Sequence, residues 1–250
     1  FRDCPKLIDI RYMNAENIDT NAFVNCPSLA YQPLGTAQLD YTMDDMGYVL
    51  CGFAETYAGN RTSIFLPGRI NNFNVYAIGA GAFENETVLE RVELADCVTI
   101  IEESAFAGCV SLEYVVMSGV SVIQKNAFSG CPNLEPLLLD ELTYIGNGAF
   151  DSITTENIFV PRNAVVEQDA FGEYIGTVYT VADSQFAKAA SGSVYNIVVR
   201  EDSLRLITLP GGTRMPGNYE TAPDVGYSQN LMIWVEGLEE GTELYKAMVA

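Results

Sequence analysis

The sequence predicts a repeat solenoid, an elongated and strand-rich stack of short coils around one continuous core. The dipeptide Ala-Phe recurs, and from Phe83 onward its spacing is 21 to 23 residues. Further columns of aliphatic, Leu and Cys residues keep the same register around it. Hydrophobic residues make up 48% of the 250 residues, which permits a sizeable core and excludes global disorder. A fixed period of this length is typical of solenoids.

The columns are best counted from the repeated Phe. The Ala-Phe pairs end at Phe23, Phe83, Phe106, Phe128, Phe150 and Phe171. Five residues before each of these Phe residues lies an aliphatic residue: Ile18, Ile78, Ile101, Ile123, Ile145 and Val166. Six residues after lie Leu29, Leu89, Leu112 and Leu134, and Leu7 follows Phe1 in the same way. Chance cannot plausibly align so many positions, so the repeat is a firm signal.

Each unit supplies a strand and a turn. The block Leu-x-x-Val-x-Leu alternates at its end, as in Val92 and Leu94, which predicts a strand with one buried face. Gly-rich turns such as 146–148 follow, and Ala-Phe then returns the chain over the core. One unit cannot bury its own apolar face, so neighbouring units must stack. We therefore expect one parallel sheet and an internal spine of Phe rings.

A Cys column lies three residues after the Phe, at Cys4, Cys26, Cys109 and Cys131. One interpretation is a ladder of buried free thiols, because Cys behaves as a small hydrophobe. The alternative is a disulfide between adjacent coils, Cys4–Cys26 or Cys109–Cys131. The coil spacing permits the distance, but parallel side chains oppose the disulfide geometry.

These columns resemble the BspA-like leucine-rich repeats, a family of bacterial and protist surface proteins. The resemblance rests on the segments 101–112 and 123–134, each with the pattern Ile-x4-Phe-x2-Cys-x2-Leu. It implies a leucine-rich-repeat solenoid of the α/β class, wound as a right-handed superhelix. Short helical or irregular turns are then expected on the convex side. The family's proteins are typically secreted or attached to the cell wall, and some act as adhesins.

The chain divides into four segments on this basis. Residues 1–34 are expected to be partial repeats, and residues 35–63 a junction or an inserted hairpin. Residues 64–200 are expected to be the main array, closed by a cap at 183–199. Residues 201–250 leave the pattern and predict a small β-rich appendage.

Alternation along the strands selects the side chains that face solvent. With Val92, Leu94 and their equivalents inward, Arg91 and Glu93 point outward in one coil. The later coils stack an apolar row, which consists of Val116, Leu138, Phe159 and Tyr179, with Tyr114 alongside. Such rows often mark contact sites. Two alternatives stay open: these residues simply favour strands, or residues 201–250 fold back over the face.

Charge and composition exclude several function classes. The net charge of −20 repels nucleic acid and anionic membranes, and no apolar run is long enough to insert into a bilayer. The absence of His removes the usual triads and imidazole metal sites. We expect no enzyme, no cofactor and no catalytic or metal-binding residues. A calcium site at Asp40, Asp44 and Asp45 is a weaker alternative.

Two functions are consistent with these observations. The first is an adhesin-like module, secreted or at the cell surface, that binds protein or glycan on a host or neighbouring cell through the exposed face of the sheet. The second is a structural spacer of a larger surface protein, with no ligand of its own.

Overall fold

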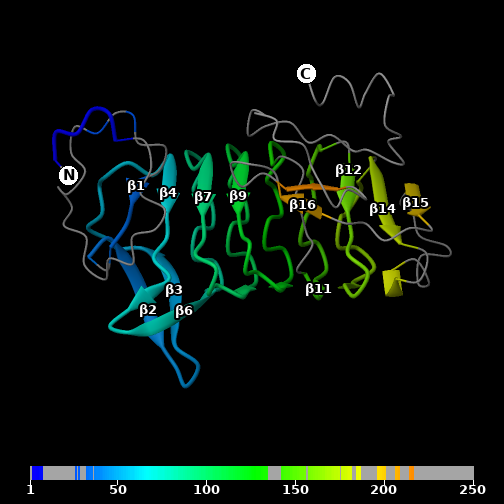
Figure 1. Ribbon diagram of the computed structural model, residues 1–250, viewed down its shortest axis with the longest axis horizontal. Coiled ribbons are helices and arrows are strands. Elements are labelled where there is room, and N and C mark those ends of the chain that lie inside the picture. The colour runs from blue at the N-terminus through cyan, green and yellow to red at the C-terminus, as the bar shows by residue number, and fades with distance from the viewer. Residues whose placement is uncertain are drawn as a thin grey trace.

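The computed structural model shows a strand-rich solenoid of about five turns, with its coils side by side along the longest axis (Figure 1). The structure describes residues 2–7, 26, 28, 32–35, 37–134, 142–155, 157–174, 176–181, 184–186, 196–200, 206–208 and 214–216. Within these ranges, helix is confined to residues 185–186, and the segments that join the strands are irregular turns. The predicted strand-rich solenoid is therefore confirmed, and of the two kinds of turn expected, helical or irregular, the described turns are irregular.

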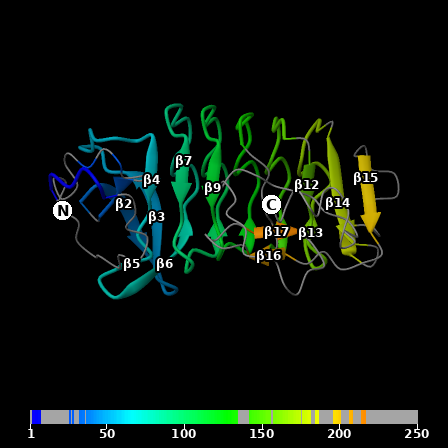
Figure 2. The same cartoon turned by 45° about the horizontal axis from the view of Figure 1, so that its top comes forward.

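The first strand of each coil joins a parallel sheet that we call sheet A. Its strands are β1 (Gln32–Pro33), β4 (Ser63–Phe65), β7 (Arg91–Glu93) and β9 (Tyr114–Val116). Farther along the stack, β12 (Asn157–Phe159), β14 (Thr177–Val181) and β15 (Asn196–Arg200) also pair in parallel. Figure 2 shows these strands following one another along the stack.

A second sheet, sheet B, takes another strand from each coil, whereas the sequence pattern predicted only one sheet. In spatial order its strands are β13 (Val165–Val166), β11 (Tyr144–Ile145), β10 (Val122–Ile123), β8 (Ile100–Ile101), β6 (Phe73–Ile78), β3 (Tyr48–Phe53) and β2 (Leu39–Met43). The short β5 (Arg69–Ile70) also pairs with β6. The repeated strands of sheet B come from the aliphatic column. Four of them, β8, β10, β11 and β13, have two residues each and are too short for alternation to reveal.

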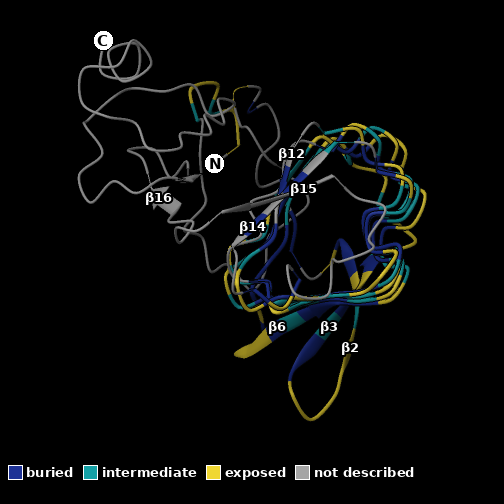
Figure 3. Ribbon diagram, turned by 90° about the vertical axis from the view of Figure 1, so that its right-hand side faces the viewer, coloured by how far each residue is buried: buried dark blue, intermediate teal, exposed yellow. Residues whose placement is uncertain are grey.

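The β2–β3 hairpin extends sheet B beyond the solenoid. Viewed along the stack, the coils superimpose, and the hairpin projects from them with an exposed tip (Figure 3). β2 and β3 are antiparallel, whereas β3 pairs with β6 in parallel. The hairpin is thus continuous with the body of the molecule through β6.

The Phe spine lies in the core as predicted. Phe106 and Phe128 have ring centroids 5.3 Å apart with an interplanar angle of 4°. Stacking continues to Phe83 at one end and through Phe150 to Phe171 at the other. All five rings are buried. Because each ring contacts the ring of the next coil, the spine runs through the whole described array.

Backbone hydrogen bonds join the Ala-Phe turns from coil to coil. The Phe106 N–H donates to the Ala127 carbonyl at 2.8 Å, and the Phe128 N–H donates to the Ala149 carbonyl at the same distance. The turns are therefore paired like strands although they are irregular. This pairing satisfies backbone groups that the core would otherwise leave without partners.

The Cys column forms the predicted thiol ladder. Cys109 and Cys131 are buried, and their thiols donate to the carbonyls of Phe83 and Phe106, each at 3.1 Å. All six cysteines are free, so the alternative of a disulfide between coils is wrong. The neighbouring Cys109 side chain and burial both raise the pKa of Cys131. The thiols act as small core residues with a local hydrogen-bonding partner.

Parts of the sequence-based division lie outside the described residues. They include Phe1, Phe23 and nearly all of the partial repeats, most of the cap at 183–199 and most of 201–250. In the last segment, β16 (Leu206–Thr208) and β17 (Arg214–Pro216) form an antiparallel pair.

Candidate interaction face

Two rows of side chains form the outer face of sheet A. Parallel register aligns Ser63 with Arg91 and Arg91 with Tyr114, which gives the first row. The second row consists of Phe65, Glu93 and Val116. Between the rows lie the inward residues Ile64, Val92 and Val115, of which the first two are fully buried. The face thus has the alternation that the sequence predicted.

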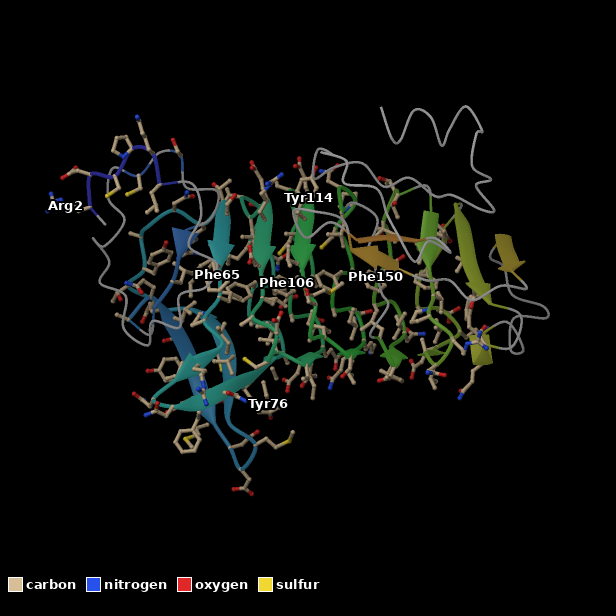
Figure 4. All side chains as sticks on the ribbon, in the orientation of Figure 1. Arg2, Phe65, Tyr76, Phe106, Tyr114 and Phe150 are labelled. Atoms are coloured by element: carbon tan, nitrogen blue, oxygen red, sulfur yellow. The ribbon has the colours of Figure 1, made fainter. Side chains whose placement is uncertain are left out.

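Tyr114 is the last member of the first row, on the end strand β9. The Arg91 guanidinium lies over its ring, 4.2 Å from the centroid, which is a cation–π arrangement. Figure 4 shows Tyr114 on the sheet A side of the stack, with Phe106 and Phe150 inside it. The ring is half-buried, so it offers a surface that is already oriented.

Val116 is the exposed member of the second row, with 40% of its surface accessible. Its neighbour Glu93 departs from the prediction, because this outward-pointing residue is only 8% exposed. Glu93 takes part in an interaction of its own and lies between Phe65 and Val116 in the ladder. It is therefore a buried acid within the row and not a solvated one.

The remaining predicted residues are described only in part. Leu138 lies outside the described residues. Phe159 and Tyr179 are aligned in the parallel pairing of β12 with β14, although the description does not extend to their side chains. The structure brings Tyr114 and Val116 together on β9, and it aligns Phe159 with Tyr179 on the neighbouring strands β12 and β14.

A second apolar row, on the outer side of sheet B, was missed by the sequence analysis. It consists of Ile100, Val122, Tyr144 and Val165, which are paired in register and partly exposed. Each of these residues directly precedes a member of the buried aliphatic column. The signal was therefore present in the sequence, one position before that column.

Carboxylates on this side bind the turns of the preceding coil. Glu167 accepts from the Tyr144 hydroxyl at 2.5 Å and from the Asn147 N–H at 2.8 Å. Glu102 accepts from the Ala80 N–H at 3.0 Å. The hydrogen bond from Tyr144 lowers the pKa of Glu167, and the same bond raises the pKa of Tyr144. These acids are used as structural acceptors between coils.

The acidic hairpin tip is organised by Asp44. This carboxylate accepts from the Tyr76 hydroxyl at 2.5 Å and from the Met46 and Gly47 N–H groups at 2.8 and 3.2 Å. In the described part of the chain, no group of three or more His, Cys, Asp or Glu side chains is arranged to hold a metal ion. The contacts of Asp44 therefore account for its position through the turn.

Comparison with known proteins finds a family model similar to the repeat. Residues 57–175 match the BspA type leucine rich repeat region, in six copies. No curated protein matches at a significant level. Within the described ranges there is no helix with the length and apolarity needed to cross a membrane.

Three solved structures are similar to this chain. A leucine-rich repeat protein from Bacteroides ovatus is 22% identical, with a TM-score of 0.49; the match covers 64% of this chain and 51% of that one. The leucine-rich repeat protein of T. pallidum is 18% identical, with a TM-score of 0.46; the match covers 67% of this chain and 98% of that one. A leucine rich cell surface protein from Faecalibacterium prausnitzii is 18% identical, with a TM-score of 0.40; the match covers 74% of this chain and 61% of that one. This chain spans about half the length of the B. ovatus protein.

Proposed function

From the BspA-type leucine-rich repeats of residues 57–175, we propose that the chain is a protein-binding module that acts through the outer face of sheet A. The proposed binding surface starts at Tyr114 and Val116 of sheet A and extends to the later positions Phe159 on β12 and Tyr179 on β14. Leu138, outside the described residues, is proposed as a further member. The observation that carries the proposal is that β9 presents an exposed Val116 beside a Tyr114 ring that lies under the Arg91 guanidinium. Such a ring is an effective contact because little side-chain freedom is lost when it is covered.

The proposed partner is a protein or glycan on a host or neighbouring cell, and the proposed location is the cell surface or the extracellular space. The family resemblance supports this location, and the net charge of −20 supports a partner that is not itself strongly acidic. Binding, and not catalysis, is the proposed activity.

The test is a binding screen against extracellular matrix proteins, glycans and cell surfaces, with variants of the face. Once a partner is found, the double variant Tyr114→Ala/Val116→Ser should weaken its binding by about tenfold or more, as expected for truncated central contacts. The matched control is Val110→Ser, because Val110 is similarly exposed, at 45%, but lies in a turn. Leu138→Ser/Phe159→Ser extends the test to the later coils.

Unchanged affinity for the face variants, with an unchanged melting temperature, would remove the proposal. The alternative is a structural spacer without a ligand. The continuous Phe stack and the hydrogen bonds between coils favour it, because both make a stiff rod. A screen in which no probe binds the intact chain supports the spacer.

A further inference from the structure

The β2–β3 hairpin carries an apolar face out of the core. On this face the Tyr41 and Tyr48 rings meet edge to face, with their centroids 5.2 Å apart. The Tyr48 ring also meets the Phe73 ring, with centroids 6.3 Å apart. Tyr48 is buried, whereas Phe73 and Met43 are each 51% exposed. Met43 is paired with Tyr48 and therefore shares this face. The apolar surface thus continues from the core to a solvent-exposed end.

β2 is also the edge strand of sheet B, since β3 is its one strand neighbour among the described residues. At the tip, the Asp44 N–H donates to the Gly47 carbonyl at 2.9 Å; at the base, the Ala54 N–H donates to the Gln38 carbonyl at 2.9 Å. Antiparallel pairing alternates between bonded and non-bonded positions. Even-numbered residues of β2 therefore face β3. The N–H and C=O groups of Leu39, Tyr41 and Met43 point away from it.

The bulge in this hairpin leaves β2 regular. The register passes from Asp40 opposite Gly52 to Tyr41 opposite Leu50, so the extra residue, Cys51, lies in β3. β2 keeps its two-residue side-chain alternation as a result. It also contains neither Pro nor Lys, which many proteins use to block an open edge.

The charge around this edge is acidic. Asp40 on β2 and Asp44 and Asp45 at the tip are all exposed. A second copy of the chain would bring the same acids together at the edge, and the net charge of −20 adds to this repulsion. The edge therefore fits a cationic strand and disfavours self-association.

We propose that the open edge of β2 binds an extended segment of a partner protein in which basic and aliphatic residues alternate, and that this segment adds a strand to sheet B. Backbone groups of Tyr41 and Met43 bind the added strand, whereas Leu39, at the base of β2, is buried and lies outside the site. Its aliphatic side chains pack beside Tyr41 and Met43. Its basic side chains lie on the other face, beside Asp40. This surface is separate from the outer face of sheet A.

The experiment measures amide hydrogen exchange of the full chain by NMR. The probe is a short synthetic peptide of alternating Lys and Val, and the control is a Glu–Val peptide of equal length. At a concentration that saturates the site, the Lys–Val peptide should slow exchange at Tyr41 and Met43 by about tenfold or more, because exchange then requires release of the strand. Thr42 faces β3 and should change less.

Two variants sharpen the test. Asp40→Lys/Asp45→Lys should abolish the protection, and Met46→Ser, at an exposed tip residue beyond β2, should retain it. No protection by the Lys–Val peptide, equal protection by the Glu–Val peptide, or protection that does not alternate along β2 would each overturn the proposal. Tyr114→Ala/Val116→Ser should leave the protection unchanged, so this result and the outcome for sheet A are independent.

Discussion

Two backbone positions in the four repeats from Phe83 to Phe150 adopt a left-handed conformation, two residues before and two residues after the Phe. The earlier positions have φ of 65° at Gly81, 58° at Ser104, 56° at Asn126 and 63° at Gly148. The later positions include Asn85, Gly108, Gly130 and Ser152. Glycine has no Cβ to strain there, and Asn tolerates the region better than most residues. The two columns share a conformation without sharing a residue type, so sequence alignment alone did not reveal them.

Ser104→Gly should stabilise the protein by about 0.5–1 kcal/mol. The relief of left-handed strain outweighs the entropy that glycine loses on folding. Urea denaturation measures the change. Ser129→Gly is the matched control, because Ser129 lies in the next coil's turn without a positive φ. It should destabilise the protein instead; a similar gain from both variants would contradict this account.

The six free thiols should differ widely in reactivity. Cys51 is exposed, whereas Cys109 and Cys131 are buried and donate to backbone carbonyls. Burial raises the pKa of Cys97, whose thiol donates to the Gly68 carbonyl at 2.9 Å. Since the thiolate is the reactive form, iodoacetamide should label Cys51 first, Cys97 more slowly and Cys109 and Cys131 only on unfolding. Peptide mapping by mass spectrometry checks this order.

At the scale of elements, the prediction of strands succeeded where the strand was long enough to alternate. Val92 and Leu94 are buried as the Leu-x-x-Val-x-Leu pattern requires. The strands at Ile100–Ile101 and Val122–Ile123 escaped notice because two residues cannot display a period of two. The hairpin face depends on contacts between Tyr48 and Phe73, which are distant in sequence and follow no repeat.

The hairpin should respond to pH at both ends of the range through Asp44 and Tyr76. Their hydrogen bond lowers the pKa of Asp44 and raises the pKa of Tyr76 to about 12. The contribution of Asp44 is present above its unfolded pKa of 3.8 and is lost as the pH falls below it. The contribution of Tyr76 is present below its unfolded pKa of 10.0 and is lost as the pH rises through about 12.

Urea denaturation of the intact protein and of Tyr76→Phe across this range measures the effect. The free-energy difference between them should be constant at intermediate pH and should shrink above pH 10 and below pH 3.8. Asp44→Asn supplies the second arm of a double-mutant cycle. A difference that stays constant at all pH values would show that this bond does not stabilise the fold.

At the scale of the whole molecule, the repeat predicts architecture better than it predicts a surface. Core columns must keep one residue type, because each coil packs on an equivalent coil. Outward positions carry no such constraint: Arg91, Tyr114 and their later equivalents differ from coil to coil. The sequence therefore identified the Phe spine correctly, but it missed the buried state of Glu93 and the apolar row of sheet B.

The spine makes a final prediction about how the coils depend on one another. Phe128 stacks on Phe106 and Phe150, at 5.3 and 5.5 Å, so Phe128→Ala removes two ring contacts as well as buried area. It should cost about 3–5 kcal/mol. Phe128→Leu leaves a smaller cavity and should cost less. Urea denaturation measures both, with circular dichroism as one probe and iodoacetamide labelling of the buried Cys109 thiol as a second probe.

Coincident transitions would mean that the coils unfold together, whereas separate transitions would mean that the stack divides at Phe128. We expect Phe128→Ala to separate the two transitions, because coils contact only their immediate neighbours and a weak junction breaks the cooperativity. Phe128→Leu should keep them coincident. A single transition in Phe128→Ala, with a loss below about 1 kcal/mol, would contradict the view that the ring stack holds the coils together.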